Sequence, residues 1–435
     1  MSAVVFAGLV AVVPLSAAPY GSVEPLWTAL FEALVFLLAV LWAVEGAVSG
    51  RWVSRAHSLA LPGLALVAYA LLQSVPLGGG ETVSYDPYQT RLFALKLLAY
   101  TTFLALLLRY TDTERRLRVL VYSVVSAGLA SALFGIVRRV VQRGQEGLLL
   151  EYLRPDVGFA QFINRNHFGY LAEMTLGLLL GLIAGRGVPR GKLLIPLALA
   201  LPVWAGLVLS NSRGGVLAML CQFIFIGATF GATRAAVRAP TGSEPSFNDR
   251  LLRSRAVRTA LTVVLLATIV VGMAWLGGDS LADRFARVDE EVAAESAKPS
   301  RTMRKDIWAA TARMFAEQPI TGVGFGGYWI AYSRYHEGSG GFVAQEAHND
   351  YLELLASGGV IGAALVALFA FLLVRQSLPR LRSGSPFERA ACLGALTGLC
   401  GVCVHSLGEF GLHVPSNAFA ALALVAAATA RPGSS

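Results

Sequence analysis

The chain has 435 residues, of which 55% are hydrophobic and 14% are charged, with a formal net charge of +9 and a mean hydropathy of +0.60. Soluble domains carry about a quarter charged residues, so the composition excludes an ordinary soluble protein and predicts an all-α polytopic membrane protein. The positive charge does not indicate nucleic-acid binding, because that function needs a soluble basic face with interleaved aromatic residues, which the sequence does not provide.

A helix needs about 20 mostly apolar residues to cross a bilayer, and the sequence predicts about twelve such helices on this criterion. The first candidate ends in LSAAPYG, which is similar to a signal-peptide cleavage site. No basic residue precedes it, so we expect a retained helix. The predicted spans are 3–18, 27–48, 57–76, 93–109, 118–138, 168–185, 192–210, 214–231, 258–277, 351–374, 389–411 and 414–430.

The distribution of Lys and Arg predicts how the chain is oriented, because cytoplasmic loops are enriched in both. Short basic loops, such as the one with Arg115, Arg116 and Arg118, alternate with long loops at 77–92, 139–167 and 278–350. Both termini are therefore predicted to be cytoplasmic, and the long loops face outward. In a bacterium this means the inner membrane, with the long loops in the periplasm. The predicted divisions are an N-terminal bundle at 1–277, a large periplasmic loop at 278–350 and C-terminal helices at 351–435.

Two familiar motifs do not indicate a function. Cys400 and Cys403 form a CxxC inside a predicted span, where small core residues are the better interpretation than metal ligands. Gly322, Gly324 and Gly327 form a literal GxGxxG, but a nucleotide fold would need it inside a βαβ unit. We expect these glycines to shape a turn that brings the backbone close to another segment.

Polar residues at membrane depth usually mark function, and two stretches on the predicted outer side carry them. GFAQFINRNHFGYLAEM, 158–174, places Arg165 and His167 at the entry to a span, where helix capping and contact with lipid headgroups are the alternative. LSNSRGGVLAML, 209–220, places Arg213 in a tight turn. A fixed guanidinium there suits phosphate binding, although a lone arginine can also extend toward headgroups.

A third stretch, RTMRKDIWAATARMFAEQ at 301–318, has the spacing of an amphipathic helix. Arg301, Arg304, Lys305 and Trp308 share one face through steps of three and four. Such a helix can lie on a membrane surface without any catalytic purpose. Its cations also suit an anionic lipid-linked substrate, and the two interpretations are compatible.

His348 directly precedes the apolar helix predicted at 351–374. The positive end of the helix dipole disfavours the protonated ring and leaves a neutral nitrogen that can accept a proton. The alternative is a residue that only caps the helix.

Four ordered motifs together resemble the O-antigen ligase family. His348-Asn349, nine intervening residues and Gly359-Val360-Ile361-Gly362 match H[NSQ]-x9-G-x-x-G. RKDIWAATARMFAEQPITGVG is similar to the family's R-x-x-I-W…P-I-x-G-V-G stretch, NSRGG to its inter-helix turn and INRNHFGYL to the entry of a central span. The resemblance implies a fold related to GT-C glycosyltransferases and transfer of a glycan from undecaprenyl diphosphate, with no metal or other cofactor.

The resemblance also implies roles for particular residues. The family's two arginines correspond to Arg213 and Arg304 and its histidine to His348; Arg301 competes with Arg304, which alone has the R-x-x-I-W spacing. We hypothesise that the arginines hold the diphosphate while His348 deprotonates the acceptor hydroxyl. The predicted substrate-binding residues are Arg301, Arg165, His167, Asn349 and Trp308.

The acceptor separates the possible activities. Lipid A–core makes the protein an O-antigen ligase, which is the preferred prediction. A second lipid-linked glycan makes it an O-antigen or exopolysaccharide polymerase, with a chain-length regulator as a natural partner, and a protein hydroxyl makes it an O-oligosaccharyltransferase. A lipid-glycan transporter or flippase is the alternative from another class, although transporters usually bind near the bilayer midplane.

Overall fold

The computed structural model describes residues 1–50, 52, 57–76, 80–142, 153, 158–237, 263, 267, 304–336 and 344–431. Every regular element within these ranges is a helix, as the composition predicted. Six of the described helices are long and apolar enough to cross a membrane: α2 (Pro25–Ser49), α4 (Pro87–Tyr110), α5 (Glu114–Gln142), α6 (Arg165–Ala184), α14 (Asp350–Ser377) and α15 (Pro386–His405).

Shorter helices occupy most of the other predicted spans, and two more lie in the predicted outer loop. All but two residues of the span predicted at 258–277 lie outside the described residues, so the count of twelve remains a prediction. The shorter apolar helices are α1 (Ser2–Ala17), α3 (Ala60–Gln73), α7 (Leu194–Leu209), the Arg213–Thr229 part of α8 (Arg213–Val237) and α16 (Pro415–Thr429), and the loop helices are α12 (Arg304–Glu317) and α13 (Tyr328–Tyr335). Single 3-10 turns lie at Tyr20–Ser22 (η1), His57–Leu59 (η2), Arg190–Lys192 (η3) and Gly411–His413 (η4).

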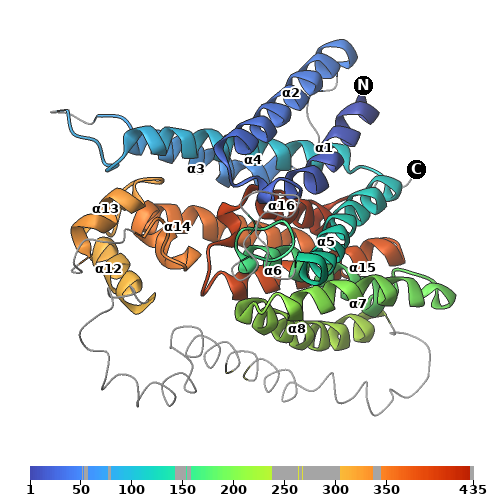
Figure 1. Cartoon of the computed structure of the whole chain (residues 1–435). Helices are drawn as coiled ribbons and strands as arrows, with labels where there is room; N and C mark the ends of the chain where they lie inside the picture. Colours follow the sequence, from blue (N-terminus) through green and yellow to red (C-terminus); the bar gives the residue numbers. More distant parts are fainter. Residues whose placement is uncertain are drawn as a thin grey trace, which may run out of the picture.

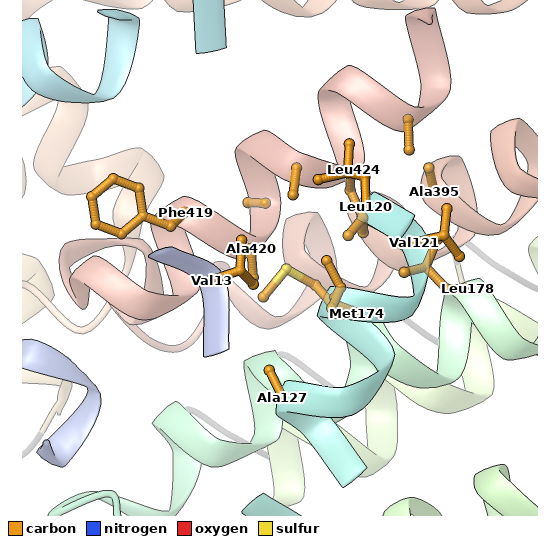
Figure 2. Close-up of a cluster of buried hydrophobic side chains, with 14 of the residues drawn as sticks. Val13, Leu120, Val121, Ala127, Met174, Leu178, Ala395, Phe419, Ala420 and Leu424 are labelled. Atoms are coloured by element: carbon orange, nitrogen blue, oxygen red, sulfur yellow. The ribbon is translucent and has the colours of Figure 1, made fainter. Parts of the chain in front are cut away.

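The hydrophobic core lies where α1, α5, α6, α15 and α16 meet (Figure 2). Met174 of α6 and Phe419 of α16 are almost completely buried there, beside Leu120 of α5. Other long helices expose much of their apolar surface, as α2 does with Leu26, which is 73% exposed. Apolar faces of this kind suit contact with lipid, and the described part of the chain is that of a multi-pass membrane protein.

Small residues bring α6 and α15 into close antiparallel contact. A Cβ at Gly177 would lie 2.3 Å from the nitrogen of Gly398, and one at Gly181 would lie 2.1 Å from the Cα of Gly394. Small residues at every fourth position let membrane helices approach until their backbones touch. The contacts advance by four along α6 as they retreat by four along α15. This register places the start of α6 beside the residues that follow α15.

The helix α14 is broken at Gly359, and the segment before α13 fills the break. Gly359 has φ 60° and ψ −164°, a conformation open only to glycine. The backbone N–H groups of Val323 and Gly324 donate to the carbonyls of Ala356 and Ser357 at 2.8 and 3.0 Å. The N–H of Val360 in turn donates to Pro319, also at 2.8 Å. The segment thus satisfies backbone groups that the broken helix leaves open.

The glycines of the GxGxxG run therefore have the role that the sequence predicted. Gly322 has a positive φ of 66°, and a Cβ there would lie 2.4 Å from the backbone of Ser357. On the far side of the break, Gln73 of α3 donates to the carbonyl of Thr321 at 2.7 Å. These contacts hold α12 and α13 beside α14, at one end of the molecule (Figure 1).

Candidate active site

The candidate site lies at the start of α14, against the loop that joins α15 to α16. The N-cap of α14 is Asn349, whose side-chain oxygen accepts from the backbone N–H groups of Tyr351 and Leu352. Its amide nitrogen donates to the carbonyl of Leu407 at 3.0 Å. Asn349 is 4% exposed, so the structure gives it a clear anchoring contact between α14 and the loop. Its predicted contact with substrate remains a prediction.

His348 lies immediately before this cap, in a left-handed backbone conformation with φ 50°. Non-glycine residues adopt such a conformation at a cost on the order of 1 kcal/mol or more, and it recurs at functional sites. The preceding residue is fixed from two sides: the N–H of Ala347 donates to Glu353 at 2.8 Å, and its carbonyl accepts from the indole of Trp308 at 3.0 Å. Trp308 therefore joins α12 to the histidine's backbone, in addition to its predicted substrate role.

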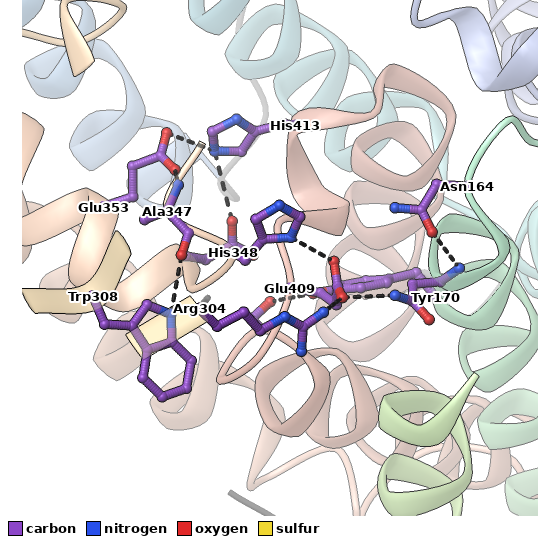
Figure 3. A network of polar contacts seen from close by, with 12 residues as sticks. Asn164, Tyr170, Arg304, Trp308, Ala347, His348, Glu353, Glu409 and His413 are labelled. Carbon is purple, nitrogen blue, oxygen red and sulfur yellow. Dashed lines mark hydrogen bonds and ion pairs between the residues drawn. The ribbon is translucent and has the colours of Figure 1, made fainter. Parts of the chain in front are cut away.

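Glu409 is the centre of the polar network (Figure 3). Its side chain is 2% exposed and accepts hydrogen bonds from three separate segments. Arg304, the first residue of α12, donates through its guanidinium. Asn166, near the start of α6, donates at 2.6 Å, and Nδ1 of His348 lies 3.3 Å from the other carboxylate oxygen. Arg304 and His348, which the sequence predicted as catalytic, are thus brought together by one carboxylate.

The ionisation of Glu409 fixes the tautomer of the neutral histidine. Burial acts to raise the pKa of Glu409, but the hydrogen bond from His348 and the charge of Arg304 outweigh it, so that the pKa lies below its ordinary value. The carboxylate is therefore ionised near neutral pH and can only accept hydrogen bonds. Nδ1 of a neutral His348 must then carry the proton, which leaves Nε2 as the acceptor. The imidazole is 30% exposed, and it makes an edge-to-face contact with Phe410, with ring centroids 4.8 Å apart.

The structure places the other predicted residues around this cluster. Arg213 is exposed at the first turn of α8, next to Gly214, which packs against His405. Arg165 is exposed at the first turn of α6, one residue before Asn166. Arg165 therefore lies next to a residue that binds Glu409, whereas Arg213 lies in the turn that packs against His405, four residues before Glu409.

His167 and Arg301 differ from these two. His167 is 7% exposed, and it also makes an edge-to-face contact with Phe410, with ring centroids 5.2 Å apart. Its backbone carbonyl accepts from Asn417 at 3.0 Å. These contacts give His167 a packing role within the bundle. Its direct contact with substrate remains a prediction. Arg301 lies outside the described residues.

Sequence reasoning missed Glu409, which belongs to no motif that the resemblance used. Asn166 lies within INRNHFGYL but was not predicted as a site residue, and both residues lie far along the chain from their partners. A usable signal was present in the small residues of α6 and α15, whose antiparallel register places 166 opposite 409. A carboxylate at the end of an apolar helix was the second signal.

The sequence was compared with known proteins and with models of protein families. The chain matches none of the curated proteins with which it was compared. A family model described as O-antigen ligase matches residues 197–367 of the chain. The matched region contains Arg213, Arg304 and His348 together with the break in α14 at Gly359, whereas Asn166 and Glu409 lie outside it. Residues 197–367 are therefore similar to the O-antigen ligase family, and the match supports the resemblance that the four motifs indicated.

Proposed function

We propose that this protein is a membrane glycosyltransferase that moves a glycan from undecaprenyl diphosphate to an acceptor hydroxyl at the periplasmic face of the inner membrane. The observation that carries the proposal is the convergence of Arg304 and His348 on the buried carboxylate of Glu409. A cation and a proton acceptor lie side by side there. The reaction requires both: the cation stabilises the leaving diphosphate, and the acceptor takes the hydroxyl proton.

The arginines stabilise the leaving group in this proposal. Arg304 binds Glu409 through one nitrogen of its guanidinium, and its side chain is 29% exposed. The other N–H groups of Arg304, with Arg213, contact the diphosphate of the donor. Fixed guanidinium groups pair well with phosphate oxygens, and one preorganised charge contact contributes about 3 kcal/mol to transition-state stabilisation.

His348 takes the proton of the acceptor. With Nδ1–H directed at Glu409, Nε2 accepts the hydroxyl proton as the oxygen attacks the anomeric carbon. The new glycosidic C–O bond forms while the bond from the anomeric carbon to the phosphate oxygen breaks, and undecaprenyl diphosphate leaves with the electron pair. Direct displacement inverts the anomeric centre. Glu409 stabilises the imidazolium that results, as the carboxylate of a catalytic triad does.

We propose a ligase with lipid A–core as its acceptor, and a polymerase is the second candidate. The same donor chemistry serves both, so the acceptor decides between them. The test incubates purified protein with an undecaprenyl-diphosphate glycan and offers lipid A–core, or the donor alone, with products sized on a gel. Transfer to lipid A–core supports the ligase, and a ladder grown from donor alone identifies a polymerase. Absence of transfer to either acceptor from a matched donor contradicts the proposal and favours a transporter.

The same assay tests whether a metal takes part. The proposed cations are guanidinium groups, so the rate of transfer is expected to be the same in excess EDTA as in added Mg²⁺. The matched control is a known Mg²⁺-dependent glycosyltransferase under identical detergent conditions, which EDTA must inactivate. Loss of transfer in EDTA, restored by a divalent cation, would overturn the metal-independent mechanism.

A further inference from the structure

A second polar pair lies in the bundle close to the site, and the proposed reaction does not use it. Nδ1 of His405, the last residue of α15, lies 3.1 Å from a carboxylate oxygen of Glu173 on α6. Both side chains are 0% exposed. Burying such a pair between membrane helices is costly compared with apolar residues of similar volume. The pair therefore calls for an explanation beyond helix packing.

The imidazole of His405 is enclosed by helices that carry predicted site residues. On one face it stacks against the ring of Tyr170 of α6, with centroids 4.2 Å apart. On another it meets the first turn of α8, where a Cβ at Gly214 would lie 2.4 Å from its Cδ2 and 2.5 Å from its Nε2. The ring therefore packs directly against the turn that presents Arg213.

The residues that follow His405 lead directly to the other half of the site. The carbonyl of Ser406 accepts from the N–H of Asp350 at 3.0 Å, and the carbonyl of Leu407 accepts from Asn349. Glu409 then binds Arg304 and His348. One short segment thus contacts the Arg213 turn at its beginning and the His348 cluster at its end.

We propose that His405, oriented by Glu173, is a positioning residue that sets the Arg213 turn at its working distance from Arg304 and His348. The inference rests on the proposed function and deepens it, because it names what fixes the two arginines relative to each other for one diphosphate. His405 is buried and contacts no substrate in this account. It acts through the backbone of Gly214.

The test is a double-mutant cycle between His405→Asn and Gly214→Ala, with the KM for donor and the KM for acceptor measured separately. Asn keeps a donor for Glu173 but removes the part of the ring that covers Gly214, and Ala at 214 pushes against the intact ring. Each single variant is expected to raise the KM for donor at least about tenfold, because small misplacements of a binding group are costly. The KM for acceptor is expected to change less than about twofold on the same reasoning.

The combined variant decides the outcome. Ala at 214 fits the space that Asn at 405 leaves, so the double variant is expected to have a KM for donor no higher than that of His405→Asn alone. Multiplied effects, or equal increases in both KM values, would overturn the proposal. The control is Gly227→Ala in the same helix, where a Cβ meets nothing within 4 Å and kinetics are expected to match the wild type. If Gly214→Ala does not fold, the separation of the two KM values in His405→Asn decides alone.

Wild-type protein assayed in parallel separates this inference from the proposed function. No transfer by the wild type contradicts the proposed function itself. Normal transfer by the wild type together with a cycle that shows no coupling contradicts only the role given to His405.

Discussion

Glu409 links three parts of the chain that are distant in sequence, through hydrogen bonds from Arg304, Asn166 and His348. Two of these partners are the groups assigned to leaving-group stabilisation and proton transfer. A carboxylate in this position orients the imidazole and offsets the charge that it gains. It also restrains the guanidinium of Arg304. Binding of the diphosphate then costs less entropy, because the side chain that it contacts is already ordered.

Substitution of Glu409 by Gln tests this role with little change of shape. The amide can still accept from Arg304, but it lacks the negative charge and can present an N–H to His348. We expect kcat to fall about 100-fold while the KM for acceptor stays within about threefold, because the histidine loses its orientation for proton transfer. Steady-state kinetics of Glu409→Gln beside Asp112→Asn, a change at an exposed surface ion pair, give the comparison. Equal activity of the two variants would contradict the role.

The pH dependence of stability follows from the same carboxylate. Burial acts to raise the pKa of Glu409, yet its hydrogen bond from His348 and the charge of Arg304 lower it below 4.5. A group whose pKa is lower in the folded state contributes stability above its ordinary pKa and loses it as pH falls through the folded value. The difference in unfolding free energy between wild type and Glu409→Gln should therefore be constant near pH 7 and shrink below pH 4.5. Unfolding in detergent across this range measures it, and a difference that grows on acidification contradicts the assignment.

Among the elements, α14 combines a capped start with a break two turns later. The cap at Asn349 holds His348 at the helix entrance, and the break at Gly359 accepts the segment that leads from α12 to α13. The same helix thus positions the histidine and, through this segment, the helix that begins with Arg304. The spacing between His348 and the glycines in the sequence motif reflects the length of helix between these two contacts.

Gly359→Ala should disrupt this arrangement. The residue has φ 60° and ψ −164°, and a Cβ would lie 2.2 Å from the carbonyl oxygen of Ile320. We expect a loss of about 3 kcal/mol or more in stability, from backbone strain and the displaced segment. Thermal unfolding in detergent measures the effect against Gly227→Ala, a helical position with open space. Equal stability of the two variants would show that the break does not need glycine.

The helices themselves were largely predictable. Long apolar runs gave most of the spans, because lipid permits few alternatives to a helix, and turn glycines marked the region around Gly322. The break at Gly359 was not predicted as a break, because its cause is a segment more than thirty residues earlier in the chain. The pairing of α6 with α15 was also missed, since small residues indicate close contact but do not name the partner helix.

At the scale of the whole molecule, the candidate site around Glu409 lies where the ends of several helices meet. The starts of α6, α12 and α14 meet at Glu409, and the start of α8 packs against His405 at the end of α15. A site at helix ends suits a lipid-linked donor whose diphosphate lies at the membrane surface and whose glycan extends into water. The sequence could predict the residues in motifs, but not the partners that only the packing of distant helices brings to them.

The proposed orientation can be tested by labelling single cysteines in spheroplasts. Ser333 of α13 and Ser383, between α14 and α15, are both exposed and lie on opposite predicted sides of the membrane. Ser333→Cys should react with a membrane-impermeant maleimide in intact spheroplasts, and Ser383→Cys only after lysis. The parent protein with its four native cysteines provides the background. The reverse pattern would place the site on the cytoplasmic side.

The central claim is that His348 removes the acceptor's proton while the arginines hold the diphosphate. The most direct measurement is the single-turnover rate of glycan transfer by wild type and His348→Ala, with donor and acceptor saturating and folding verified by thermal unfolding. We predict that the variant binds both substrates and transfers glycan at least about 100-fold more slowly, as loss of a general base requires. Near-normal transfer by His348→Ala would contradict the claim.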